Sequence, residues 1–302
     1  MVSANATAGP THSSGLKGSL QTHWPAPAKL NLFLHITGRR ADGFHDLQTV
    51  FQLIDLCDDI AITVRDDGVV ERTVGAAGVP PETDLVVRAA KALRDATGTP
   101  LGASIGVTKR IPLGAGLGGG SSDAATVLLA LNHLWSTGLG PELLAEIGLA
   151  LGSDVPVFVA GSSAWAEGRG ERLEPMELPE RWFVVVNPRV HVPTALVFQA
   201  PELTRNSPKI TMRAAFQAGG RNDCESVVRA QFPEVAGALD WLSQHGHARL
   251  TGTGASVFAD FARAADAERV AARVPDRWTS FVARGLNTSP VLERLNWGVA
   301  KR

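Results

Sequence analysis

A glycine-rich stretch stands directly before a segment with the apolar spacing of a helix, and it is well suited to binding an anion. It runs from Ile111 to Ala125 as IPLGAGLGGGSSDAA. Glycines let a backbone bend closely around a ligand, and the N–H groups at a helix start stabilise phosphate. A flexible Gly/Ser linker is the alternative, but linkers do not usually end by capping a strongly apolar helix. The stretch therefore predicts a phosphate-binding loop, although it matches neither GxxxxGK[ST] nor a dinucleotide GxGxxG with an acid about 20 residues later.

Lys29 and Asp154 have the side chains that phosphoryl transfer to an alcohol needs. A carboxylate can take the proton of the attacking hydroxyl, and a cation can balance the developing charge. Each residue also has a structural interpretation, since Asp154 could cap a turn after Gly152 and Lys29 could extend its charge from a strand end into water. Either structural interpretation would be preferred for one residue alone. Together with the glycine loop, the pair favours catalysis.

Alternating polarity predicts the strand that carries Lys29. Residues 29–36 alternate with period two, which places Leu30, Leu32, Leu34 and Ile36 on one face and Lys29, Asn31, Phe33 and His35 on the other. A turn-rich stretch at residues 38–43 and an apolar segment around Val50 to Ile54 predict a second strand, with Phe44 and His45 in the loop between.

The remaining pattern alternates helices and strands and predicts an α+β fold. We expect helices at residues 83–93, 141–151 and 262–274, and strands at 103–107 and from 182 onward. The serines and Asp123 are expected to supply the oxygens at the start of the helix after the glycine loop. Asp154 is expected in a short loop that leads into a strand at residues 155–159.

Length and composition indicate an ordinary globular protein of two domains. The chain has 302 residues, 44% of them hydrophobic and 20% charged. We expect a tail at residues 1–22, a domain at 23–166 and a second domain at 167–302. The tail is rich in Ser, Thr, Gly and Ala but contains no Arg, so a disordered tail is favoured over an organelle transit peptide.

Charge and cysteine content exclude several classes of partner. Lys plus Arg number 29 against 30 for Asp plus Glu, so nothing global favours nucleic acid or an anionic membrane. The two cysteines, Cys57 and Cys224, fit neither a disulfide framework nor a zinc site, which agrees with a cytoplasmic location. His245 and His247 have no third ligand nearby in the sequence, so no protein metal site is expected.

The stretch from Pro112 to Ala125 resembles the second motif of the GHMP kinases, in an extra-glycine form, GLGGGSSDAA. That form is similar to the branch of this family that acts on a cytidine-diphosphate-linked methylerythritol. Segments at residues 27–34, 39–45, 47–51, 152–156 and 250–255 resemble the same branch, in the same order. The resemblance runs from about Trp24 to Pro290, and the ordered set is far more specific than any single motif.

The resemblance implies an α+β fold whose N-terminal domain is like the second domain of ribosomal protein S5 and whose C-terminal domain is ferredoxin-like. It implies a kinase of the non-mevalonate isoprenoid pathway that uses ATP and Mg²⁺ to phosphorylate the 2-hydroxyl of that methylerythritol. Lys29 and Asp154 would be the catalytic pair. The implied ATP-binding residues are Asp84, Lys109, Pro112, Leu113, Gly114, Ala115, Gly116, Leu117, Gly118, Gly119, Gly120, Ser121 and Ser122.

For the cytidine, the resemblance implies that aromatic rings at positions 44 and 198 sandwich the base while His45 bonds its edge. Asn31, Arg40, Phe51, Gly252 and Gly254 would also contact the substrate. Phe198 could instead be a core residue, and the two glycines could form a simple tight turn.

The sequence departs from the branch at two positions. Phe44 stands where Tyr is common, which keeps ring stacking and removes a phenol hydrogen bond. Asp84 stands where Asn is common, which puts the detail of adenine binding in doubt. Alternative functions are another GHMP kinase, of the homoserine or mevalonate type, or a non-catalytic ligand sensor on this scaffold, although retention of Lys29 and Asp154 argues against a sensor.

Overall fold

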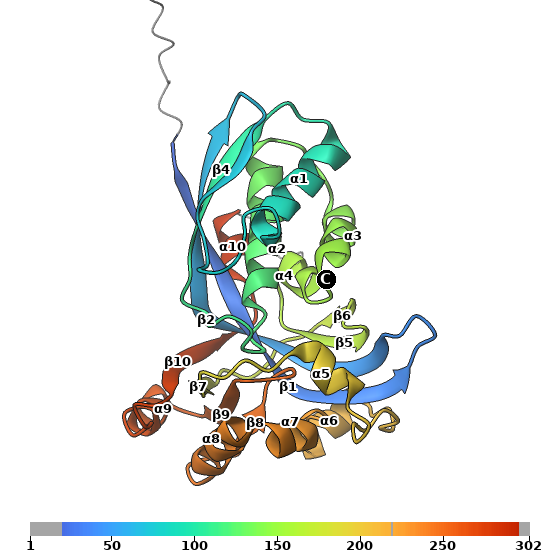
Figure 1. The fold of residues 1–302 in the computed structure, drawn as a ribbon, viewed down its shortest axis with the longest axis vertical. Coiled ribbons are helices and arrows are strands. Elements are labelled where there is room, and N and C mark those ends of the chain that lie inside the picture. The colour runs from blue at the N-terminus through green and yellow to red at the C-terminus, as the bar shows by residue number, and fades with distance from the viewer. Residues whose placement is uncertain (1–19, 219, 296–302) are drawn as a thin grey trace, which may run out of the picture.

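The computed structural model describes residues 20–218 and 220–295 (Figure 1). Most of the predicted tail, up to residue 19, therefore lies outside the described residues. The strands are β1 (Thr22–Arg39), β2 (His45–Arg65), β3 (Val70–Val74), β4 (Gly102–Thr108), β5 (Ala164–Gly168), β6 (Arg172–Pro175), β7 (Trp182–Asn187), β8 (Arg249–Leu250), β9 (Val257–Phe261) and β10 (Thr279–Leu286). The helices are α1 (Leu85–Thr97), α2 (Gly119–Leu134), α3 (Pro141–Leu151), α4 (Val155–Ala160), α5 (Thr194–Gln199), α6 (Met212–Ala218), α7 (Glu225–Gln231), α8 (Pro233–Ser243), α9 (Ala264–Ala271) and α10 (Pro290–Arg294).

The strands of the described residues form one mixed sheet in the order β3-β4-β2-β10-β7-β9-β8. β1 pairs with β2 along almost its whole length, and β5 pairs with both β2 and β6. Only β3 and β4 run parallel among the pairs described. β10 pairs with both β2 and β7, so it connects the two halves of the sheet. The domain boundary expected after residue 166 falls within β5, and the division into two domains at this point stays a prediction.

Helices α1 to α4 and α10 form a layer over one face of β1, β2 and β4 (Figure 1). The middle of α2 is buried almost completely, from Ser122 to Asn132, because α1, α3 and α4 pack around it. A helix enclosed in this way carries apolar residues all round rather than on one stripe. α2 therefore holds its N-terminal end, where the glycine loop arrives, in a fixed position.

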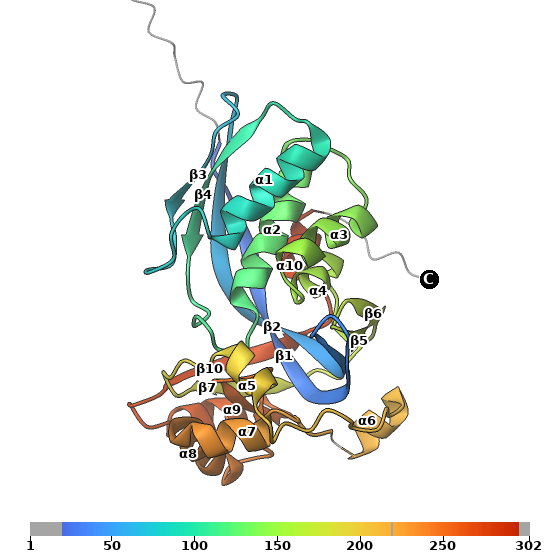
Figure 2. The same ribbon diagram turned by 45° about the vertical axis from the view of Figure 1, so that its right-hand side comes forward.

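The second half of the chain packs α7, α8 and α9 below strands β7, β9 and β8, and α5 lies above them, near β1 (Figures 1 and 2). Its core includes Val184, Val186, Val257 and Leu239, all essentially without solvent contact. Alternate residues of β7 and β9 supply this core because successive side chains of a strand point to opposite faces, and Phe183, Val185 and Phe258 are buried on the other face. No helix within the described ranges is long and apolar enough to cross a membrane.

Most predicted elements are present, and the differences have physical causes. The helix at Pro141–Leu151 was predicted with those bounds, and the expected strands at residues 103–107 and from 182 are present as β4 and β7. The expected strand at residues 155–159 is wrong, because this segment forms helix α4. A short apolar run does not distinguish a buried strand from a buried helix, and here α2 and α3 enclose it on the helical side of the sheet.

Two local boundaries also differ. His45 lies in β2 and pairs with Arg39, rather than in the loop. Helix α2 begins at Gly119, before the serines, with Gly118 as its N-terminal cap residue at a φ of 72°. The last glycines of the loop are therefore helical, and their N–H groups belong to the helix start.

Candidate active site

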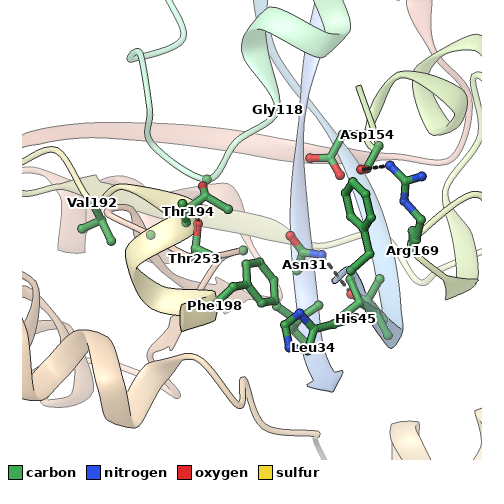
Figure 3. A pocket seen from close by; sticks show the side chains of 18 of the residues that line it. Asn31, Leu34, His45, Gly118, Asp154, Arg169, Val192, Thr194, Phe198 and Thr253 are labelled. Atoms are coloured by element: carbon green, nitrogen blue, oxygen red, sulfur yellow. Dashed lines mark hydrogen bonds between the residues drawn. The ribbon is translucent and has the colours of Figure 1, made fainter. Parts of the chain in front are cut away.

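A cavity of about 740 Å³ lies where the two halves of the sheet meet (Figure 3). Residues from β1, β2, the glycine loop, the start of α4, the region of α5 and the turn at residues 252–254 line it. It brings together these predicted site residues: Lys29, Asn31, Phe44, His45, Phe51, Gly114, Gly116, Gly118, Ser121, Asp154, Phe198, Gly252 and Gly254. The cavity is large enough for a small-molecule ligand.

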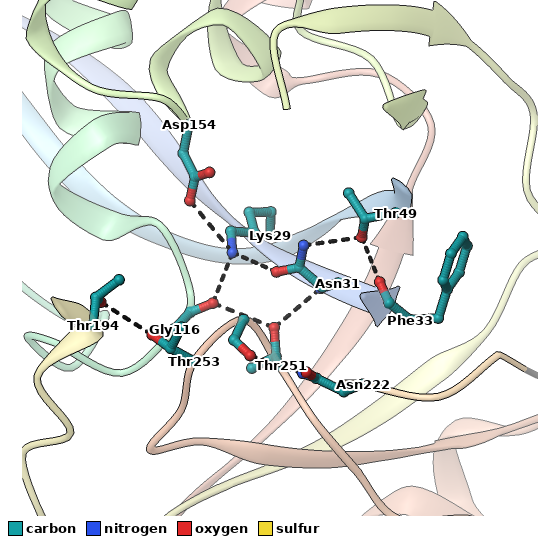
Figure 4. A network of polar contacts seen from close by, with 11 residues as sticks. Lys29, Asn31, Phe33, Thr49, Gly116, Asp154, Thr194, Asn222, Thr251 and Thr253 are labelled. Atoms are coloured by element: carbon teal, nitrogen blue, oxygen red, sulfur yellow. Dashed lines mark hydrogen bonds and ion pairs between the residues drawn. The ribbon is translucent and has the colours of Figure 1, made fainter. Parts of the chain in front are cut away.

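Lys29 is the centre of a polar network at one end of the cavity (Figure 4). Its ammonium group donates to Asn31 Oδ1 at 2.6 Å and to the Gly116 carbonyl at 2.9 Å, and it lies 3.4 Å from Asp154 Oδ2. Lys29 is 3% exposed, whereas the Asp154 side chain is 34% exposed. The carboxylate can therefore meet a ligand directly while the buried cation fixes its position.

Asn31 and Thr251 hold this network rigid. The Asn31 amide donates to Thr49 Oγ1 at 3.0 Å, and the Asn31 backbone N–H donates to Thr251 Oγ1 at 3.0 Å. Thr251 in turn donates to the Gly116 carbonyl at 3.3 Å. Strand β1, the glycine loop and the 251–254 turn are thus tied to one another at the Lys29 side chain (Figure 4).

The glycine loop needs its glycines at two close approaches. A Cβ at Gly116 would collide with the Thr251 carbonyl, and one at Gly118 would lie 2.8 Å from the ring of Phe158. Both residues have a positive φ, of 74° and 72°, which side chains other than glycine rarely adopt. The loop then enters the 16-residue helix α2, and the free N–H groups at a helix start of this kind stabilise anions.

A buried ion cluster ties the two ends of this loop together. Lys109 Nζ lies 2.5 Å from Asp58 Oδ2 and 2.7 Å from Asp123 Oδ2, and the other Asp58 oxygen accepts from the N–H groups of Arg110 and Ile111. Burial raises the pKa of Asp123 to about 7, with a further rise from Asp58 and an opposing effect of Lys109. Burial alone would lower the pKa of Lys109, but the two carboxylates outweigh it and the pKa is raised.

Aromatic and basic side chains form the other end of the cavity. The rings of His45 and Phe198 stack with centroids 5.1 Å apart and an angle of 22°. Arg205 donates to His45 Nε2 at 3.3 Å, so the neutral ring carries its proton on Nδ1. Burial lowers the pKa of His45, with further lowering by Arg205 and Arg39. Phe44 is 47% exposed, and the guanidinium of Arg169 lies 3.7 Å from its ring centroid.

Other predicted site residues do not line the cavity. Arg40 is exposed and bonds Asp42 and Asp46, whereas its neighbour Arg39 faces the cavity. Asp84 caps α1 by accepting from the Val86 N–H and pairs with Arg72. The remaining predicted residues outside the lining are Lys109, Pro112, Leu113, Ala115, Leu117, Gly119, Gly120 and Ser122.

Sequence reasoning missed several residues that line the cavity. Thr194 and Thr253 bond each other at 3.0 Å across the site. Arg169 and Arg205 supply two of its cations. Thr253 lies in the segment at residues 250–255 that carries the resemblance, whereas no local pattern marked Thr194, Arg169 or Arg205, whose place in the site depends on how distant segments meet. Within the described ranges, no three His, Cys, Asp or Glu side chains form a group that could hold a metal ion.

Comparison with known proteins identifies the class of this fold and site. Residues 84–162 match the GHMP kinases N terminal domain, and residues 200–280 match the GHMP kinases C terminal domain. A crystal structure of mevalonate kinase superimposes with a TM-score of 0.67 at 15% identity, covering 88% of this chain and 99% of that one, which supports the fold alone. The chain has the GHMP kinase fold, as the sequence predicted.

Similarity is much higher to one kind of GHMP kinase. The 4-diphosphocytidyl-2-C-methyl-D-erythritol kinase of Cupriavidus necator is 58% identical over 274 residues, which cover 88% of this chain and 94% of that protein. The protein of the same name in Pseudomonas aeruginosa is 51% identical, with 92% and 98% covered. A crystal structure of 4-(cytidine 5'-diphospho)-2C-methyl-D-erythritol kinase has 34% identity and a TM-score of 0.76, covering 87% of this chain and 99% of that one. The chain belongs to the family of 4-diphosphocytidyl-2-C-methyl-D-erythritol kinases, which confirms the resemblance.

Proposed function

We propose that this chain transfers the γ-phosphoryl group of ATP to the 2-hydroxyl of 4-diphosphocytidyl-2-C-methyl-D-erythritol, giving the 2-phosphate and ADP for isoprenoid precursor synthesis. The observation that carries the proposal is one cavity with the Lys29–Asp154 pair and the glycine loop at one end and Phe44, His45 and Phe198 at the other. A substrate with an alcohol at one end and a nucleobase at the other matches this division. The identity to relatives of that name supports the same substrate.

Asp154 is the proposed general base. Its carboxylate is the partly exposed member of the Lys29–Asp154 pair, so it can accept a hydroxyl proton as the oxygen attacks phosphorus. The bond between the γ-phosphorus and the bridging oxygen of ADP breaks as the new ester bond forms. The buried ammonium of Lys29 lies 3.4 Å from this carboxylate and offsets charge on the phosphoryl group.

The glycine loop is the proposed phosphate site. Gly114, Gly116 and Gly118 line the cavity without side chains, and the N-terminus of α2 supplies N–H donors beside them. ATP would then place its γ-phosphoryl group near Lys29, which bonds the Gly116 carbonyl. Most of the catalysis in such a reaction comes from positioning and from stabilising charge.

Magnesium fits the oxygen donors that face the cavity. The hydroxyl of Ser121 and the carboxylate of Asp154 are hard ligands on the lining, and Mg²⁺ is usually held by one or two carboxylates together with substrate phosphates. An ion there would neutralise charge on the ATP phosphates. Lys29, Asp154 and the loop would orient the reactants around it.

At the other end, Phe44 and Phe198 are the proposed stacking surfaces for cytosine. The Nδ1–H of neutral His45 is a donor for an acceptor on the base edge, because Arg205 already occupies Nε2. A cytoplasmic location completes the proposal, because two cysteines that are far apart in the sequence do not form a disulfide framework typical of secreted proteins.

A coupled assay of ADP release tests the proposal. The purified chain is supplied with ATP, Mg²⁺ and, in separate reactions, the cytidine-linked alcohol, homoserine or mevalonate. We expect efficient turnover with the first alcohol only, and a product with phosphate on the 2-hydroxyl by ³¹P NMR. Efficient phosphorylation of homoserine or mevalonate, with none of the cytidine-linked alcohol, would refute the substrate assignment.

A further inference from the structure

Arg169 is a half-buried cation on the wall of the cavity, in the turn between β5 and β6. The turn is fixed at its base, because Gly168 has a φ of 73° and the Arg169 N–H donates to the carboxylate of Glu171. Figure 3 shows the Arg169 side chain next to Asp154. The backbone therefore holds this side chain toward the site rather than toward solvent.

The guanidinium of Arg169 contacts both ends of the site. Its centre lies 3.7 Å from the ring centroid of Phe44, and its Nη2 donates to Ser153 Oγ at 3.5 Å. Ser153 is the residue directly before Asp154. Contact with an aromatic face orients a guanidinium without using its donors. Arg169 thus lies between the ring proposed to stack on the base and the carboxylate proposed to activate the alcohol.

The donors of Arg169 are poorly satisfied by the protein. Its Nε is buried without a hydrogen-bond partner, and Arg169 forms no ion pair with a carboxylate of the described residues. Two other cations of the lining are already engaged: Lys29 bonds Asn31 and Gly116 beside Asp154, and Arg205 bonds His45 and three carbonyl groups. A half-buried guanidinium with unused donors is suited to an anionic ligand.

We propose that Arg169 binds the diphosphate that links the cytidine to the alcohol of the substrate. This proposal rests on the proposed function, which puts cytosine at Phe44 and the hydroxyl at Asp154, so that the diphosphate spans the interval that Arg169 occupies. A planar guanidinium can donate to phosphate oxygens in pairs. It also offsets repulsion between the diphosphate and the Asp154 carboxylate, which acts within the same cavity.

Binding of two fragments of the substrate tests this role. Cytidine and CDP are titrated calorimetrically into the wild type, Arg169→Gln, Arg169→Lys and the control Arg172→Gln, with a non-hydrolysable ATP analogue filling the ATP site. Arg172 is a matched control because it lies in β6, outside the cavity, and its side chain is 62% exposed. We expect Arg169→Gln to weaken CDP binding roughly 10- to 100-fold, because the variant loses a charge-assisted contact. The affinity for cytidine should stay nearly unchanged.

The remaining outcomes discriminate between explanations. Arg169→Lys should retain part of the CDP affinity, and Arg172→Gln should retain all of it. In steady-state kinetics, Arg169→Gln should raise the KM of the cytidine-linked alcohol without a matching rise in the KM of ATP. Equal losses for cytidine and CDP would mean that Arg169 only supports Phe44, and no loss for either would remove it from the site. Both results overturn the proposal. A wild type that binds neither fragment would instead refute the proposed function, and this proposal with it.

Discussion

The ammonium of Lys29 lies 3.4 Å from the carboxylate of Asp154, yet the two side chains differ tenfold in exposure, at 3% and 34%. The buried cation is fixed by Asn31 and the Gly116 carbonyl, whereas the carboxylate faces the cavity. This asymmetry supports the proposed role of Asp154 as proton acceptor and the proposed role of Lys29 as the cation that offsets charge on the phosphoryl group. It also suggests which substitution separates chemistry from binding.

Asp154→Asn should lower kcat by roughly 10²- to 10⁴-fold, because the amide keeps the size of the side chain but cannot take a proton. ATP affinity, measured by calorimetry without Mg²⁺ because Asp154 is also a proposed ligand of that ion, and the thermal unfolding midpoint should change little. Asp95→Asn on the exposed face of α1 is the control, with a side chain 73% exposed. Wild-type turnover in a folded Asp154→Asn protein would exclude this residue as the base.

Gly118→Val should weaken ATP binding far more than it weakens the fold. The new side chain would meet Phe158 at 2.8 Å and Lys29 at 3.2 Å, at the entrance to α2. Gly138→Val is a matched control, since Gly138 has a similar φ of 69° but nothing within 4 Å of its Cβ position. If both variants bind ATP like the wild type, the loop is only a connector.

Phe44 should hold the cytosine by stacking. Base stacking on an aromatic ring is worth about 1–3 kcal/mol, which corresponds to a loss of roughly 5- to 150-fold in affinity for Phe44→Ala. Phe44→Tyr should retain the affinity, and Phe44→Leu should lose most of it although it keeps bulk. Steady-state kinetics with each substrate varied separately measures this. Equal losses for ATP and for the alcohol would indicate a structural role.

His45 predicts a pH dependence confined to the cytidine-linked substrate. Burial and the neighbouring arginines Arg205 and Arg39 lower its pKa below 6.5, so the ring stays neutral at pH 7 and becomes charged only in more acidic solution. The neutral form of the ring is favoured in the folded site. Binding of the cytidine-linked substrate that needs this form is therefore present above pH 6.5 and is lost as the pH falls through the lowered pKa of His45. The KM of the alcohol should rise there while that of ATP does not. His45→Gln should abolish this rise, and its persistence in the variant would assign the titration to another group.

Asp123 should make the folded state less stable as the pH rises. Its pKa is raised from 3.8 to about 7, so between these values the folded protein retains a proton that the unfolded chain has released. The stabilisation that comes from the retained proton is complete below pH 3.8, the pKa of Asp123 in the unfolded chain, and is lost as the pH rises through about 7. Asp123→Asn cannot titrate, so its free energy of unfolding, measured by urea denaturation, should fall less between pH 4 and 8. An unchanged pH dependence would contradict the raised pKa.

Local patterns predicted the part of the site that lies on one strand. Period-two alternation placed Lys29 and Asn31 on the same face, and their side chains do bond at 2.6 Å. All four residues of this face, Lys29, Asn31, Phe33 and His35, are buried. Their burial comes from the cavity and from later segments packed over β1, which no alternation within β1 encodes.

Long-range pairings account for what the sequence could not predict. Lys109 meets Asp58 from 51 residues away, and Arg169 reaches Phe44 from the turn after β5. Neither pair has a spacing that marks it, since each depends on the register of β2 with β4 or β5. Helix α4 was mistaken for a strand because Pro156 and the apolar residues around it are compatible with either state until α2 and α3 enclose them.

The position of β10 has a consequence for biosynthesis. Among the described strands it is the last to be made, yet it is the one that pairs with both β2 and β7. While the ribosome is still adding residues up to Thr279, a nascent chain can fold its two halves but lacks the strand that joins them. The cavity takes residues from both halves, so we expect ligand binding to appear only when translation is nearly complete. A nascent chain stalled before Thr279 would then expose the edges of β2 and β7 at the same time, which makes these edges the natural targets of a chaperone.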